Sequence, residues 1–178
     1  MFEYDKETLE RLLKIEEFDL EEIELDKIKH VPMHQYRVST QENPYLLVEN
    51  LQVCIGLYAY SKDFAYAAHI NPVVMRGDEF ILDENKNIKY CNRVEKLYEE
   101  IIKAKIKDNV YVGVSIGCNP VSKTYEVVYM LNELINELII KLKNNGISIV
   151  KLELENNHVF IVDSKNENII TPTIQKIK

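Results

Sequence analysis

Residues 52–71, QVCIGLYAYSKDFAYAAHIN, contain two apolar runs separated by a short polar break. Such a pair of runs is typical of a β-hairpin, and the dipeptide Ser61-Lys62 fits a two-residue loop between the strands. With this loop, Cys54 lies directly opposite His69. Residues that face each other in an antiparallel pair have β-carbons about 4.5–5.5 Å apart. The stretch therefore predicts a hairpin that places a thiol beside an imidazole.

The same register places Gln52 opposite Asn71, on the same face as the thiol and the imidazole. Gly56 and Ala67 follow on that face, and their small size would leave room for a substrate. The opposite face is apolar and is expected to face the core; its residues are Val53, Ile55, Leu57, Tyr66, Ala68 and Ile70. A one-residue shift in register would move the thiol and the imidazole to opposite faces, so the arrangement depends on the loop.

This group of side chains suggests acyl transfer on an amide. A thiolate is a nucleophile, and a neighbouring imidazole lowers the pKa of the thiol and protonates the leaving group. An amide side chain orients the imidazole in Cys-His-Asn hydrolases. We therefore interpret Cys54 as a candidate nucleophile and His69 as a candidate base, with Gln52 and Asn71 as further candidate catalytic residues. The structural alternative is that Cys54 is a small apolar core residue and His69 a buried, hydrogen-bonded side chain.

The rest of the chain mixes helical and strand patterns without strict alternation, which favours an α+β fold. The clearest element is a helix at 122–144, with Ser122 as N-cap and Asn145-Gly146 as the C-terminal stop. Further helices are expected at 6–17, within 19–29 and at 91–107, and strands at 36–38, 45–60, 64–71, 109–116, 147–155, 158–164 and 168–171. This predicts a mixed sheet with packed helices, in α-β-β-α-β-α-β-β-like order, as a single compact domain.

The net charge of −7 resides entirely in the N-terminal segment. Residues 1–28 hold eleven acids and four bases, and the remaining 150 residues hold 18 of each. We interpret residues 1–30 as an acidic helical appendage and residues 31–178 as the α+β domain. The appendage is either a solvated helical face or a docking arm for a basic partner.

Composition excludes several classes of function. The balanced charge of the body gives no basic stripe for nucleic acid, and no apolar run is long enough for membrane insertion. The acidic start of the chain lacks a signal-peptide pattern, and three cysteines at irregular spacing do not form a disulfide framework. A reduced, cytoplasmic protein is expected.

No metal or cofactor is expected. His30 and His34 are four residues apart, but Pro32 between them disfavours a continuous helix. Cys91 and Cys118 belong to no Cys-x-x-Cys pattern. The five glycines are isolated, so no glycine-rich phosphate loop is present.

The order of elements and three short motifs resemble the chemoreceptor glutamine deamidases, the CheD-like proteins. Residues 54–57, CIGL, and 67–70, AAHI, resemble the stretches that carry the catalytic Cys and His of that family. Residues 144–150, NNGISIV, resemble the strand after its long helix, and the resemblance covers about residues 45–171. It implies a domain that deamidates glutamine side chains of a protein, with this cysteine as nucleophile and this histidine as base.

The sequence departs from the family pattern around the nucleophile. The family has Gly-Ser before its Cys, where this chain has Gln52-Val53, and a catalytic Thr six positions before it, where this chain has Val48. A persisting activity would need Gln52 or Asn71 in place of that Thr. Two hypotheses follow: a cysteine amidohydrolase, specifically a protein-glutamine deamidase, or a non-catalytic interaction protein on the same scaffold. In both cases the substrate or partner is a protein, and nothing in the sequence indicates an oligomeric state.

Overall fold

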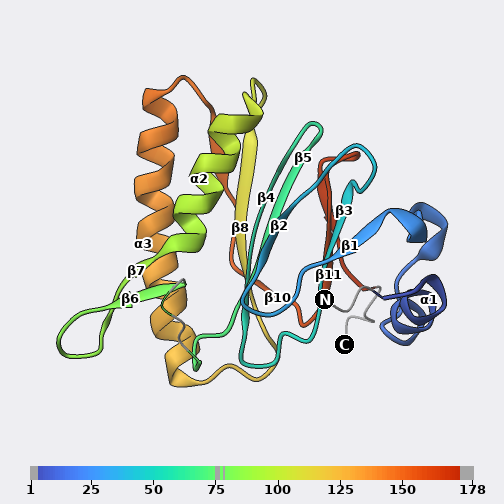
Figure 1. Ribbon diagram of the computed structural model, residues 1–178, viewed down its shortest axis with the longest axis horizontal. Helices are drawn as coiled ribbons and strands as arrows, with labels where there is room; N and C mark the ends of the chain where they lie inside the picture. Colours follow the sequence, from blue (N-terminus) through green and yellow to red (C-terminus); the bar gives the residue numbers. More distant parts are fainter. Residues whose placement is uncertain (1–3, 75–76, 78, 173–178) are drawn as a thin grey trace.

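The computed structural model describes residues 4–74, 77 and 79–172 (Figure 1). Its helices are α1 (Lys6–Ile15), α2 (Asn92–Ala104) and α3 (Ser122–Asn144), and its 3-10 turns are η1 (Leu20–Glu22) and η2 (Leu25–Lys27). Its strands are β1 (Ile28–His30), β2 (Tyr36–Val38), β3 (Tyr45–Val48), β4 (Ile55–Ser61), β5 (Phe64–Ile70), β6 (Phe80–Leu82), β7 (Ile88–Cys91), β8 (Val110–Ile116), β9 (Ile149–Lys151), β10 (Glu155–Asn156), β11 (Phe160–Asp163) and β12 (Asn168–Ile170).

These elements stack in four layers (Figure 1). Helices α2 and α3 lie side by side on one face of a central sheet, which has the strand order β10-β8-β4-β5-β2 with β9 also beside β8. The other face of the central sheet packs on an outer sheet, β1-β3-β11-β12. Helix α1 covers the far face of the outer sheet. The mixture of helices and mixed sheets confirms the predicted α+β class.

Each of the three interfaces between layers contains an apolar core. The helix side of β4 and β5 supplies Ile55, Leu57, Tyr66, Ala68 and Ile70, so the predicted core face of the hairpin is confirmed at these positions. The other side of the same strands is also buried, because it packs on the outer sheet. All seven residues of β5 are buried for this reason.

The loop of the β4–β5 hairpin is Lys62-Asp63, and the predicted loop, Ser61-Lys62, is wrong by one residue. Ser61 pairs with Phe64 and is buried in the ladder. Asp63 takes the positive φ that closes the turn, 58°, which Asp adopts more readily than most residues. His69 consequently pairs with Gly56 and not with Cys54. Since the loop moves by one residue on both strands, each side chain keeps its face.

The segment predicted as one strand at 45–60 forms two strands in different sheets. β3 belongs to the outer sheet and β4 to the central sheet. Between them the chain turns at Asn50, whose φ is 61°. The crossing brings Leu51 fully into the core between the sheets. The polar residues Glu49, Asn50 and Gln52 interrupt the apolar sequence at this crossing, and the prediction of one strand at 45–60 overlooked this signal.

The N-terminal segment is packed against the outer sheet. Leu13 and Phe18 share a core with Leu47 and Ile161 of the outer sheet. The second helix expected within 19–29 is wrong: the segment forms η1, η2 and β1, and β1 pairs in parallel with β3. The predicted domain boundary at residue 30 thus coincides with the end of β1, a strand of the outer sheet.

The helix predicted at 122–144 is present with these bounds. Ser122 is its first residue and not its N-cap, which is Val121. The Thr124 hydroxyl takes over the capping role, since it accepts from the Val121 N–H at 3.1 Å and donates to the Val53 carbonyl at 2.8 Å. Among the described residues, no helix combines the length and the apolarity needed to cross a bilayer.

The hairpin of β6 and β7 projects beside α3 and was not predicted (Figure 1). Phe80 and Cys91 pair at its base and are buried in the helix-side core. At its tip, the Asp83 carboxylate accepts from the backbone N–H groups of Asn85 and Asn87, each at 2.9 Å.

Candidate functional site

Cys54 lies just before β4, in the core between the two sheets. Its side chain is 3% exposed and packs with Leu51 and Phe160. Burial raises the pKa of the Cys54 thiol to about 11, and the negative charge of Glu79 adds to the rise. The thiol is therefore neutral at pH 7, whereas a nucleophilic cysteine requires a lowered pKa.

His69 lies on β5 and is also 3% exposed. Burial lowers the pKa of its imidazole to about 4, and the neighbouring His30 adds to the fall. The nearby backbone of Val31 acts in the opposite direction and offsets part of the fall in pKa. Neither ring nitrogen of His69 makes a hydrogen bond of normal geometry with a described residue. Both members of the predicted pair are thus held neutral, which is the opposite of a thiolate–imidazolium pair.

The register separates the two side chains along the hairpin. Gly56 faces His69, and Cys54 lies two residues further along the same face. Diagonal neighbours of this kind are about 7–8 Å apart. The expected space for a substrate above Gly56 is filled: a Cβ at this position would lie 2.6 Å from the Phe160 ring. The predicted direct pair, and the open patch beside it, are therefore wrong.

Gln52 is exposed, and its side chain contacts the turn after β8. Its amide oxygen accepts from Asn119 Nδ2 at 2.6 Å and from the Cys118 thiol at 3.2 Å. The backbones of the two segments are also joined, because Asn119 N–H donates to the Gln52 carbonyl at 3.0 Å. Gln52 thus joins the segment before β4 to the segment before α3 through its side chain and its backbone.

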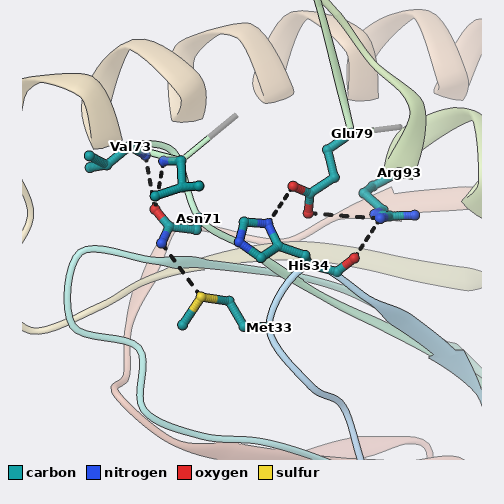
Figure 2. A network of polar contacts seen from close by, with 7 residues as sticks. Met33, His34, Asn71, Val73, Glu79 and Arg93 are labelled. Atoms are coloured by element: carbon teal, nitrogen blue, oxygen red, sulfur yellow. Dashed lines mark hydrogen bonds and ion pairs between the residues drawn. The ribbon is translucent and has the colours of Figure 1, made fainter. Parts of the chain in front are cut away.

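Asn71 closes a turn directly after β5. Its side-chain oxygen accepts from the backbone N–H of Val73 at 2.9 Å and of Val74 at 3.2 Å. Its amide nitrogen lies 3.5 Å from the Met33 sulfur (Figure 2). The structure thus does not combine Gln52 and Asn71 into a block with the thiol and the imidazole.

Sequence reasoning missed a cluster of three histidines. His30 Nε2 lies 3.3 Å from Glu49 Oε1, and His34 Nδ1 lies 2.5 Å from Glu79 Oε2. His69 is close enough to both other histidines for each to lower its pKa. The spacing of His30 and His34 was visible in the sequence, but their glutamate partners are far away in the chain. No group of three metal-ligating side chains among the described residues is arranged to hold a metal ion.

Each end of this cluster carries a further partner. The Tyr4 hydroxyl donates to Glu49. Burial acts to raise the pKa of the Glu49 carboxyl, but the hydrogen bonds from His30 and Tyr4 outweigh the effect of burial. The pKa of Glu49 is therefore lowered. At the other end, Glu79 and Arg93 point toward each other (Figure 2). Arg93 Nη2 lies 3.8 Å from Glu79 Oε1. Arg93 also donates to the His34 carbonyl at 2.6 Å. The cluster links both sheets to α2, which is a structural role.

Hollows in the surface lie away from Cys54. One cavity of about 360 Å³ is lined by Tyr4 and His30, with Lys6, Lys29 and Asp26 giving it charges of both signs. Two more hollows, of about 410 and 180 Å³, lie where β7 passes over α3 and α2.

No protein-family model matches the chain, and no curated protein matches it either.

Proposed function

We propose that this chain is a non-catalytic interaction protein, which acts by binding another protein. The observation that carries the proposal is the state of Cys54, whose thiol is buried between the sheets and neutral at pH 7. A hydrolase needs a nucleophile that a substrate reaches and an ionised or readily ionised thiol. Exposed apolar side chains, in contrast, gather on α3 beside the hollows under β7, which suits a partner.

The deamidase implied by the resemblance to CheD-like proteins is the alternative. It would require a conformation in which Phe160 leaves Gly56 and Cys54 reaches solvent. It would also require His69 to accept a proton near neutral pH, against the burial that lowers its pKa to about 4. Both requirements oppose the packing between the two sheets.

The thiols of the chain provide an internal test. Cys118 is exposed, and Cys91 is buried in the helix-side core, so the native protein contains a matched positive and negative control. We expect iodoacetamide at pH 7.5 to label Cys118 rapidly and to label Cys54 as slowly as Cys91, as measured by mass spectrometry. Incubation with a glutamine-containing peptide should release no ammonia above the level of Cys54→Ala.

Rapid labelling of Cys54 that depends on His69, together with ammonia release that Cys54→Ala abolishes, would overturn the proposal in favour of the deamidase. Labelling after addition of denaturant checks that Cys54 is chemically competent once exposed.

A further inference from the structure

The two hollows under β7 adjoin each other and form one groove. They share Leu134 and Glu137 of α3, and together they extend from Asn87, just before β7, to Cys91 at the end of this strand. We call this surface the α3 groove. It lies on the helix side of the molecule, across the central sheet from the outer sheet and α1 (Figure 1).

The floor of the groove is apolar and its rim is acidic. Ile88, Met130 and Leu134 form part of the floor and are partly buried. The carboxylates at the rim are Glu95, Glu126, Glu133 and Glu137, and the ammonium groups are Lys89 and Lys141. Carboxylates thus outnumber ammonium groups, although the chain outside residues 1–28 has equal numbers of acids and bases.

Two of these four carboxylates, Glu133 and Glu137, make no hydrogen bond or ion pair with any described residue and are available to a partner. The other two are engaged: Glu126 pairs with Lys123 at 2.6 Å, and Glu95 accepts from the Tyr90 hydroxyl. Glu133 and Glu137 are exposed and one helical turn apart on α3, so both point along the same side.

Large exposed side chains continue the apolar surface from the groove toward the start of α3. Val121, Tyr125 and Tyr129 recur every four residues and are 41%, 55% and 71% exposed. Tyr129 also lines the groove. Exposed tyrosines beside a hollow are typical of protein interfaces, because they bury a large area and lose little conformational freedom.

We propose that the α3 groove docks an amphipathic helix of a partner protein, which places large apolar side chains on the floor and lysine or arginine side chains against Glu133 and Glu137. This inference rests on the proposed function and names its docking surface and the chemistry of its partner. Glu126 and Glu137 are about 16 Å apart along α3, the length of three helical turns, so a partner helix of similar length matches the rim. Helix-in-groove binding of this kind is a recurring mode of recognition.

The test uses a synthetic helical peptide of about four turns, with leucine on one face and lysine on the other. Its fluorescence anisotropy is measured against the full chain at low salt. We expect saturable binding that weakens with added salt, and no binding of the same peptide with glutamate in place of lysine. Glu133→Lys/Glu137→Lys should weaken binding at least tenfold, and Tyr129→Ala should weaken it several-fold.

The matched control is Glu42→Lys/Glu153→Lys, which makes the same charge change at exposed positions outside the groove. We expect it to bind as the unaltered chain does, apart from a small general effect of charge. Thermal unfolding of all variants checks that each is folded.

Equal loss in both double variants would show attraction by net charge alone and would overturn the groove inference. Binding that neither the groove variants nor Tyr129→Ala affects would overturn it as well, as would absence of binding. None of these results supports the deamidase hypothesis, which Cys54 labelling and ammonia release test separately.

Discussion

His34 Nδ1 lies 2.5 Å from Glu79 Oε2, and this contact joins the loop before β2 to the residue before β6 (Figure 2). The Glu79 side chain is fully buried, and Arg93 on α2 is nearly so. Three segments that are distant in the chain are thus connected through one carboxylate. Moving a charge out of water costs free energy that its partners must offset, so removal of one partner is expected to destabilise the fold.

We expect Glu79→Ala to lower the free energy of unfolding by about 3–5 kcal/mol, because it leaves the charge of Arg93 buried without its carboxylate. Glu84→Ala, in the exposed tip of the β6–β7 hairpin, should change it by less than about 0.5 kcal/mol. Urea unfolding followed by circular dichroism measures both. Equal stabilities of the two variants would mean that the buried contact contributes nothing net.

His69 predicts a loss of stability in mild acid. Burial lowers its pKa to about 4 in the folded chain, against 6.5 for the free side chain. Above pH 6.5 neither state binds the proton, and between pH 6.5 and 4 only the unfolded state binds it. As the pH is lowered from 6.5 to 4, the free energy of unfolding should therefore decrease, by about 3 kcal/mol in total for this group.

The measurement is a series of urea titrations at half-unit steps from pH 7 to 5, a range above most of the carboxyl titration. His69→Phe should show a smaller slope with pH than the unaltered chain, whatever its absolute stability. An unchanged slope in His69→Phe would assign the acid sensitivity to another group.

The two leucines at positions 134 and 138 of α3 should behave differently. Both leucines line the α3 groove, but Leu138 is 2% exposed in the helix-side core, whereas Leu134 is only partly buried. Leu138→Ala should cost about 2–5 kcal/mol of unfolding free energy, and Leu134→Ala should cost less, because fewer atoms lose contacts. A larger loss for Leu134→Ala than for Leu138→Ala would contradict the assigned orientation of the helix.

Removal of residues 1–28 should damage the fold, although the charge distribution led us to interpret residues 1–30 as an appendage. The deletion uncovers the far face of the outer sheet, which packs on Leu13 and Phe18. We expect broad, weakly cooperative thermal unfolding and association of the shortened chain. Point variants separate packing from charge: Leu13→Ala should cost about 2–5 kcal/mol, and Ile15→Ala, at a side chain that is 72% exposed, should cost little. A deletion variant that is monomeric and unfolds cooperatively would show that the N-terminal segment is an appendage and not part of the fold.

Local patterns in the sequence were sufficient for elements whose contacts repeat along the chain. The helix at 122–144 follows from apolar residues at helical spacing and from the Asn145-Gly146 stop, and the structure has the same bounds. The two faces of β4 and β5 follow from alternation, which survives the one-residue error in the loop. The strands of the missed β6–β7 hairpin have only three and four residues, and their register shifts between Ile81 and Leu82, so no regular pattern develops.

The sequence by itself determined the α+β class, the long helix and the side of the hairpin on which Cys54 and His69 lie. The tertiary structure alone decided what covers that side. Phe160, more than a hundred positions after Gly56, occupies the space above it, and the outer sheet closes over both side chains. Burial then holds the thiol and the imidazole in their neutral forms, because ionising either one would require charge without solvation in the core. The apolar runs of β4 and β5 report that the hairpin is buried, but the contacts that bury it come from distant parts of the chain.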